Sequence, residues 1–191
     1  MKSYTVKNLM VPLSEYATVS EAATLLDAVK ALKEAQAAFN QKRYRHRAIL
    51  VIDKNNHIVG KLSQHDVIEA LEPNYKEMRN SAPSGSIHRL GFSDGFVKST
   101  IEQYHLWEKA LENLCGKAIH QKVIKLMYAP GKGEFVNERA SMDEAIHRLI
   151  IGRHHSLLVT ADHDVREIVG LLRLTDVFEF VSDAMQECFL K

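Results

Sequence analysis

The feature that most constrains the fold is a phrase that occurs twice. Residues 59–71 read VGKLSQHDVIEAL, and residues 169–181 read VGLLRLTDVFEFV. Both contain a Val-Gly pair, a short apolar run, an aspartate six residues after the glycine and an apolar tail with helical spacing. Two copies of one local pattern predict a chain built from two similar halves, because internal repeats decide the architecture before any single residue does.

The residues before each phrase also align when Gly60 is placed over Gly170. Residues 47–53 and 155–161 are apolar and β-branched runs, and a polar turn follows each of them. Each half therefore predicts a β-hairpin before the aspartate. The tail after each aspartate predicts a helix, whose apolar face would hold Val67, Ile68 and Leu71 in the first half and Val177, Phe178 and Val181 in the second.

The repeat extends further toward the start of each half. Residues 17–28 align with residues 134–145, and each stretch predicts a strand that leads into a helix. Both helices should begin with a capping box, which is formed by Ser141 and Glu144 in the second half and, in a weaker version, by Thr24 and Asp27 in the first.

Residues 73–120 interrupt the repeat. The stretch 80–96 is rich in Gly and Ser and predicts a loop. Residues 99–120 predict one amphipathic helix, whose apolar stripe holds Ile101, Tyr104, Leu111, Leu114 and Ala118. This stripe could pack on its own domain, form a contact between two copies or close over a ligand, and the sequence leaves these alternatives open.

Length and composition exclude some classes of protein. The chain has 191 residues, a formal net charge of +1 and no apolar run of 18 residues. Bulk charge therefore favours neither nucleic acid nor a membrane surface, and no membrane-spanning helix is expected. The N-terminal residues lack the apolar core of a signal peptide. Cys115 and Cys188 form no Cys-x-x-Cys pair, which predicts reduced thiols in a cytoplasmic protein.

On these residues the chain resembles a tandem pair of CBS domains, the module named after cystathionine β-synthase. The family phrase is Gly, two apolar residues, Ser or Thr, two variable residues and Asp, and residues 60–66 and 170–176 are similar to it. The resemblance implies an α+β fold of two domains, each strand-helix-strand-strand-helix, packed as a pseudo-symmetric pair with a helical insertion between them. The expected boundaries are 1–72 for the first domain, 73–120 for the insertion and 121–191 for the second domain.

The resemblance also implies a function. Such pairs often bind AMP, ADP, ATP or S-adenosylmethionine in clefts between the domains, with the Asp on the ribose and the Ser or Thr on a phosphate. Two pairs usually associate, so a homodimer is expected, and the module senses a ligand without catalysing a reaction. The resemblance thus implies no catalytic cofactor and no metal site, and the sequence does not name the regulated protein.

The chemistry of Ser63 and Asp66 agrees with the implied site. An ionised Asp only accepts hydrogen bonds, which suits the two hydroxyls of a ribose, and a Ser hydroxyl can donate to a phosphate. The same two residues are also a capping arrangement that needs no ligand. By resemblance Thr18, in the first strand, lines this cleft, although ordinary core packing would explain this residue equally well.

Arg173 stands in the second half at the position where the family has Ser or Thr. Its guanidinium can bind a phosphate through several donors, or it can fill the cleft and pair with Asp176. The two clefts should therefore differ, and the first is the better candidate for a ligand.

A basic run, KRYRHR at residues 42–47, precedes a strand of the first half, and His155 stands at the matching place in the second. By resemblance these side chains lie near the base and phosphates of a ligand. The alternative is a set of solvated cations at the C-terminal end of a helix. Alternation along the strand predicts Arg45 and Arg47 on one side and His46 on the other.

Together these features predict a stand-alone regulatory module that binds an adenine nucleotide and is not an enzyme. The alternative is a protein-interaction scaffold that has kept the fold without the ligand. No motif in the sequence supports a hydrolase, a metal site or nucleic-acid binding. An open cleft beside Asp66 would favour the sensor, whereas a cleft filled by Arg173 or by residues 73–120 would favour the scaffold.

Overall fold

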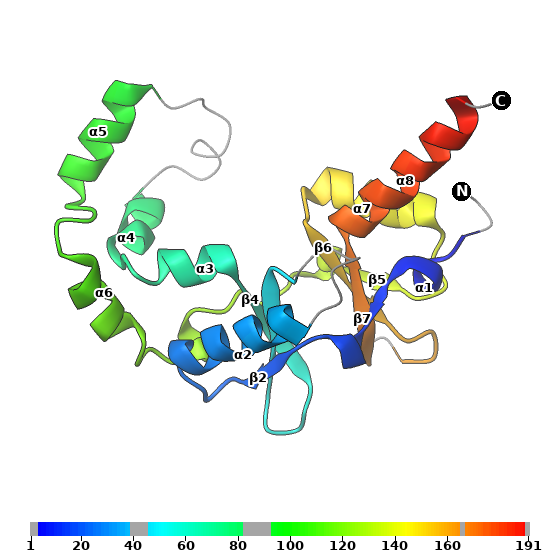
Figure 1. Cartoon of the computed structure of the whole chain (residues 1–191), viewed down its shortest axis with the longest axis horizontal. Coiled ribbons are helices and arrows are strands. Elements are labelled where there is room, and N and C mark those ends of the chain that lie inside the picture. The colour runs from blue at the N-terminus through cyan, green and yellow to red at the C-terminus, as the bar shows by residue number, and fades with distance from the viewer. Residues whose placement is uncertain (1–3, 39–45, 82–92, 165–166, 190–191) are drawn as a thin grey trace.

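The computed structural model describes residues 4–38, 46–81, 93–164 and 167–189. The first half contains β2 (Thr18–Ser20), α2 (Leu25–Ala38), β3 (Ala48–Ile52), β4 (Ile58–Ser63) and α3 (Gln64–Glu69). The second half contains β5 (Phe135–Asn137), α7 (Met142–Gly152), β6 (Ser156–Thr160), β7 (Ile168–Arg173) and α8 (Leu174–Phe189). The predicted α+β order of strand, helix, strand, strand and helix is therefore confirmed in both halves (Figure 1).

Each half is built around one small sheet. The first sheet has the strand order β2-β3-β4, and the second has the order β1-β7-β6-β5, where β1 is Val11–Pro12. In both sheets the first strand of the half pairs in parallel with the second, and the hairpin is antiparallel. Among the helices that the structure describes, none is long and apolar enough to cross a membrane.

The segment that leads into each half packs on the opposite half. These segments contain α1 (Val6–Leu9) and two 3-10 turns, η1 (Leu13–Glu15) and η2 (Val123–Lys125). A third turn, η3 (Lys132–Glu134), contacts α7 and β6 of its own half. β1 pairs with β7, where Val11 lies opposite Leu171, and Val6 is buried in the core of the second half. In the reverse direction, Tyr128 forms a bridge to Lys61 of β4. The two halves are thus joined by exchanged segments.

Three apolar clusters stabilise this arrangement. One lies in each half, beneath the helices, and the third lies between the halves. Leu50 of β3 and Leu158 of β6 hold equivalent positions in their sheets and meet in this third cluster, together with Val11, Tyr16 and Leu171. Burial of one such aliphatic side chain stabilises a fold by roughly 1.5–3 kcal/mol, so the contact between halves is a substantial part of the core.

The glycine of each repeated phrase lies beneath an exchanged segment. A Cβ atom at Gly170 would come within 2.5 Å of the carbonyl oxygen of Val11. At Gly60 it would come within 2.6 Å of the sulfur of Met127 and 3.0 Å of the carbonyl oxygen of Tyr128. The close approach of the opposite segment therefore explains why both phrases have glycine at this position.

The prediction of one amphipathic helix at 99–120 is wrong. The insertion contains α4 (Asn74–Ser81), α5 (Asp94–Gln103) and α6 (Leu111–Ala118), so the predicted helix is divided in two. The predicted loop at 80–96 is also wrong at its ends. Ser81 closes α4, and Asp94 opens α5 after the N-cap Ser93, while residues 82–92 lie outside the described part of the chain.

Tertiary contacts explain the break between α5 and α6. His105 and Trp107 have positive φ angles of 53° and 59°, which end the helix. Leu106, which is absent from the predicted stripe, is only 4% exposed. The backbone N–H of Trp107 donates to Glu72 Oε2 at 2.9 Å, and Asn74 Nδ2 donates to the carbonyl of Tyr104 at 3.0 Å. These bonds fix the turn against the residues that follow α3.

The prediction of which capping box is complete is wrong: the box expected to be weaker, Thr24 and Asp27, is the complete one. Thr24 and Asp27 form the complete reciprocal box, with Asp27 Oδ2 accepting from Thr24 N at 2.9 Å and from Thr24 Oγ1 at 2.7 Å. Ser141 Oγ accepts from Glu144 N at 3.2 Å, but the carboxylate of Glu144 pairs with Arg148 instead. The ion pair with Arg148, one turn later, thus keeps the carboxylate of Glu144 from completing the capping box.

The apolar faces predicted after the two aspartates are only partly buried. Val177 is buried and Val67 is half-buried, as predicted. Ile68 and Phe178, which were expected on the same faces, are 59% and 67% exposed. These two residues hold the same position in the repeat, so both halves expose a large apolar side chain at one place.

Candidate functional site

Ser63 and Asp66 lie where β4 ends and α3 begins, and they bond to each other. Asp66 Oδ2 accepts from the N–H and from the hydroxyl of Ser63, both at 2.7 Å, and Ser63 Oγ accepts from Asp66 N at 3.2 Å. This is the capping arrangement that the sequence left open as an alternative. Asp66 Oδ1 accepts no hydrogen bond from the residues that the structure describes, so this oxygen is available to a ligand.

The structure places Arg47 beside this pair. The N–H of Gln64 donates to the carbonyl of Arg47 at 2.9 Å, which holds the start of α3 against the entry to β3. Arg47 is exposed and His46 is buried, so the predicted alternation is confirmed for these two residues. Thr18 is exposed at the start of β2, and Arg45 lies outside the described residues.

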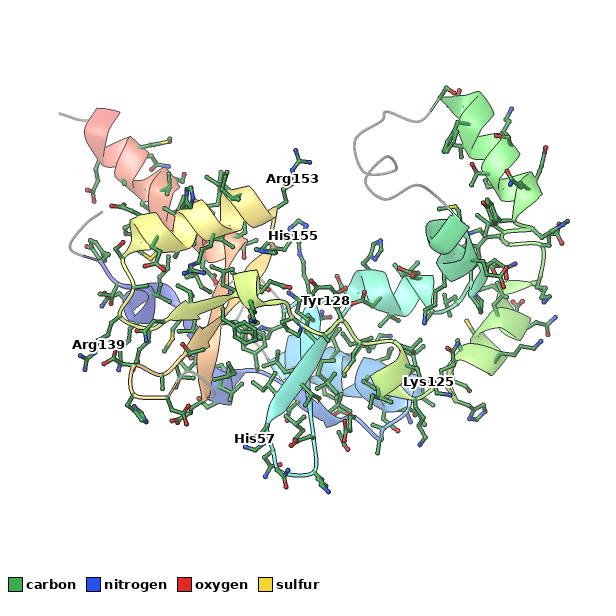
Figure 2. The ribbon with its side chains drawn as sticks, turned by 180° about the vertical axis from the view of Figure 1, so that it is seen from behind. His57, Lys125, Tyr128, Arg139, Arg153 and His155 are labelled. Carbon is green, nitrogen blue, oxygen red and sulfur yellow. The ribbon has the colours of Figure 1, made fainter. Side chains whose placement is uncertain are left out.

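The equivalent position in the second half is filled by its own arginine. Arg173 is buried, and its Nε and Nη2 donate to the two oxygens of Asp176, each at 2.5 Å. Burial opposes the charge of Arg173, but the hydrogen bonds to Asp176 raise the pKa of its guanidinium. The N–H of Leu174 donates to the carbonyl of His155 at 3.0 Å, which repeats the bond between Gln64 and Arg47, and His155 itself is exposed (Figure 2).

Two residues of the first half cover this buried pair. The rings of Tyr16 and His46 lie 4.2 Å apart, and Tyr16 forms a hydrogen bond with Arg173. Burial raises the pKa of the Tyr16 phenol, and burial together with the charge of Arg173 lowers the pKa of His46. Tyr16 belongs to no motif, so sequence reasoning did not select it. His46 was indicated only by its place opposite the arginines in the strand.

A second polar cluster connects the halves through Glu134, which is 3% exposed. Its Oε2 accepts from Lys61 Nζ of β4 at 2.7 Å, and its Oε1 accepts from the hydroxyl of Tyr128 at 2.6 Å and from Gly131 N at 3.1 Å. Figure 2 shows Tyr128 where the two halves meet. Burial alone would raise the pKa of Glu134, but the bonds from Lys61 and Tyr128 lower it. Sequence reasoning missed this cluster, because Lys61 lies 73 residues before Glu134 in the chain.

These clusters give the two halves different chemical capacities. The first half presents a half-buried aspartate with a spare acceptor and an exposed arginine, whereas the second half has its aspartate saturated by a buried arginine. Among the residues that the structure describes, no three His, Cys, Asp or Glu side chains form a group that could hold a metal ion.

Solved structures show which proteins share this architecture. The chain is similar to CBSX2 in complex with AMP, with 19% identity, a TM-score of 0.54 and coverage of 96% of this chain and 97% of that chain. It is similar to a CBS domain-containing protein of unknown function from Bacillus anthracis str. Ames Ancestor, with 15% identity, a TM-score of 0.61 and coverage of 95% of each chain.

A third similar structure is the CBS domain of the bacterial CNNM/CorC family Mg2+ transporter in complex with ATP. The identity is 16%, the TM-score is 0.56, and the match covers 93% of this chain and 87% of that chain. At these identities the likeness establishes the fold. No curated protein matches the chain at the level of sequence.

The family itself is established by sequence and structure together. A model of the CBS domain family matches residues 6–73 and 133–183, which together make up more than half of the chain. Each matched segment contains one copy of the repeated phrase and one copy of the strand-helix-strand-strand-helix order. The chain therefore belongs to the CBS domain family and carries two CBS domains in tandem.

Proposed function

We propose that the chain is a regulatory module, not an enzyme, that binds one molecule of AMP, ADP or ATP beside Asp66. The observation that carries this proposal is the difference between the two repeated aspartates. Asp66 has one oxygen without a donor among the described residues and stands next to the exposed Arg47. Both oxygens of Asp176 are occupied by Arg173.

Each group around Asp66 matches one part of a nucleotide. The free oxygen can accept from the hydroxyls of a ribose, and the hydroxyl of Ser63 can donate to a phosphate. Arg47 supplies a planar cation for the phosphate charge, and Thr18 lies at the exposed start of the neighbouring strand. The AMP and ATP complexes of structurally similar CBS proteins support the choice of an adenine nucleotide.

We assign a structural role to the second cleft. Arg173 and Asp176 are closed off by Tyr16 and His46 of the first half, so a ligand there would have to displace a buried ion pair. Displacement of a buried charge from its partner is costly. The module should therefore bind one nucleotide per chain, with His155 left as an exposed side chain at the edge of the closed cleft.

Thermal unfolding and calorimetric titration of the full chain test this proposal. The ligands are AMP, ADP, ATP and S-adenosylmethionine. The last is included because the resemblance to CBS domain pairs implies it as a further possible ligand. A ligand at a hundredfold excess over its Kd adds about 2.7 kcal/mol of stability, which raises the midpoint by about 5–10 °C for a chain of this size. We expect this shift from at least one nucleotide, with one molecule bound per chain.

The variant Asp66→Ala separates binding from capping. It removes the ribose acceptor and also a helix cap, and loss of a cap costs about 1 kcal/mol. Asp27→Ala removes the matching box at the start of α2 and serves as the control. Only Asp66→Ala should abolish the ligand shift. An undiminished shift in Asp66→Ala would place the ligand elsewhere, and no binding of any compound would favour the interaction scaffold.

We further propose that two copies of the chain associate through α3, α7 and α8. These helices lie along the same edge of the molecule (Figures 1 and 2). Their most exposed apolar side chains are Ile68, Ile150, Ile151, Phe178 and Met185. An isologous contact would place this same patch of both copies face to face and remove its apolar side chains from water in each copy.

A further inference from the structure

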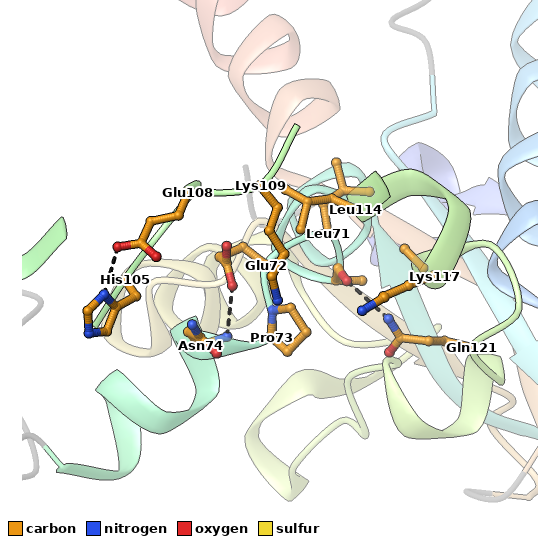
Figure 3. A pocket seen from close by; sticks show the side chains of 12 residues that line it. Leu71, Glu72, Pro73, Asn74, His105, Glu108, Lys109, Leu114, Lys117 and Gln121 are labelled. Carbon is orange, nitrogen blue, oxygen red and sulfur yellow. Dashed lines mark hydrogen bonds and ion pairs between the residues drawn. The ribbon is translucent and has the colours of Figure 1, made fainter. Parts of the chain in front are cut away.

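A pocket with a cavity volume of about 220 Å³ lies between the end of α3 and the insertion (Figure 3). Its walls are residues 70–74, the turn between α5 and α6, and α6 itself. Leu71, Pro73 and Leu114 supply apolar surface. The volume lies below the range of roughly 300–1,000 Å³ that is typical for drug-sized ligands, so the pocket suits a small molecule.

Two lysines supply the positive charge of this pocket. Lys109 and Lys117 both line it, and Figure 3 shows their side chains reaching toward its centre from the insertion. Neither forms a hydrogen bond or an ion pair with any residue of the described chain. Two like charges that face one hollow repel each other, and an anion between them would remove this repulsion.

The carboxylates of the pocket are already committed to other groups. Glu72 is buried and accepts from the backbone N–H groups of Asn74, at 3.3 Å, and Trp107, at 2.9 Å. Glu108 pairs with His105 Nδ1 at 2.6 Å. Neither carboxylate bonds to Lys109 or Lys117 among the described residues, so the ammonium donors of both lysines remain open to a ligand, which must carry enough negative charge to bind beside Glu72 and Glu108.

We propose that this pocket binds a small dicarboxylate. Its two carboxylates pair with Lys109 and Lys117, and its short methylene chain lies on Leu71, Pro73 and Leu114. Inorganic phosphate would satisfy the charge but would leave the apolar wall without a contact. The site belongs to the insertion and is independent of the nucleotide proposed beside Asp66.

Succinate and glutarate are the probes, because they carry two carboxylates on a short apolar chain. Trp107 is the only tryptophan of the protein, and its backbone is bonded to Glu72 in the pocket wall, so its fluorescence reports on the site. Titration of the full chain, followed by Trp107 fluorescence and by calorimetry, should give saturable binding with a Kd of roughly 1 mM or below. Succinamide, which has the same shape without charge, should not bind.

The variant Lys109→Gln/Lys117→Gln tests the assigned residues. Both side chains are exposed, so the midpoint of unfolding should stay within about 2 °C of the wild-type value. Dicarboxylate binding should weaken at least tenfold in this variant and persist in Lys54→Gln, which removes an exposed lysine at a hairpin turn, and in Asp66→Ala. An equal response to succinamide, no saturation by about 20 mM, or undiminished binding in the double variant would overturn the proposal.

Discussion

The ion pair between Lys61 and Glu134 should be a principal polar contact between the two CBS domains. Lys61→Met keeps the length of the side chain but removes the cation from a carboxylate that is 3% exposed. Loss of one partner of a buried pair costs about 3–5 kcal/mol. Tyr128 and Gly131 still donate to Glu134, and the Lys61 side chain is 19% exposed, so we expect a loss of about 2–3 kcal/mol.

Urea unfolding followed by far-UV circular dichroism measures this loss, and the thermal midpoint should fall by about 5–10 °C. Glu134→Gln should cost less, about 1–2 kcal/mol, because the remaining Lys61 can reach water. The double variant should then cost about 1–2 kcal/mol less than the sum of the two single variants, because the interaction is lost only once.

The pair formed by Lys7 and Glu138 is the matched control. Its atoms are 2.8 Å apart, but the Lys7 side chain is 64% exposed, so Lys7→Met should cost less than about 1 kcal/mol. If Lys61→Met also cost less than about 1 kcal/mol, or if the double variant were additive, the contact between the domains would not depend on this pair. The pKa of Glu134 is lowered by folding, so its contribution should be present above the unfolded pKa, near 4.5, and be lost as the pH falls through the lower folded value.

Three further predictions test other parts of the fold. Gly170→Ala should destabilise the protein by about 1–3 kcal/mol, because a Cβ there would come within 2.5 Å of a backbone oxygen. Gly60→Ala should cost less, because its nearest atom is the sulfur of a movable methionine and its nearest backbone atom lies at 3.0 Å; equal losses would contradict this reasoning. Folding lowers the pKa of His46, so the unfolded chain binds more protons than the folded chain below about pH 6.5. The free energy of unfolding should therefore fall as the pH is lowered from about 7.5 to 5.5, and it should fall less steeply in His46→Phe than in the wild type. Phe178→Glu should convert the proposed dimer to monomers in analytical ultracentrifugation, and an unchanged mass would refute the assigned surface.

The candidate site in the first half of the chain could be predicted from the local sequence. Ser63 and Asp66 were indicated by the repeated phrase and its resemblance to the CBS pattern, at an expected junction of strand and helix. In the structure Ser63 ends β4 and caps α3, and Asp66 lies in the first turn of α3. Arg173 was expected either to bind a phosphate or to fill its cleft, and its pairing with Asp176 could not be chosen from the sequence. That choice depends on Tyr16 and His46, which reach the arginine from the other half.

The insertion shows where periodicity fails. Residues 99–120 have helical spacing throughout, but the backbone turns at His105 and Trp107 because Glu72 accepts the N–H of the latter. This bond joins residues 35 positions apart, and a pattern read over one or two turns contains no information about it. The pocket with Lys109 and Lys117 exists only because of this turn.

The sequence by itself determined the doubled order of strands and helices, because hydrophobic period, turn residues and caps act over a few neighbouring residues. Tertiary structure alone decided how the two copies are joined. The exchanged segments bring Val11 to Leu171 and Glu134 to Lys61, and residue pairs so far apart in the chain meet only in the tertiary structure. Their partners are set by shape and charge across the contact between the halves, which no local pattern specifies.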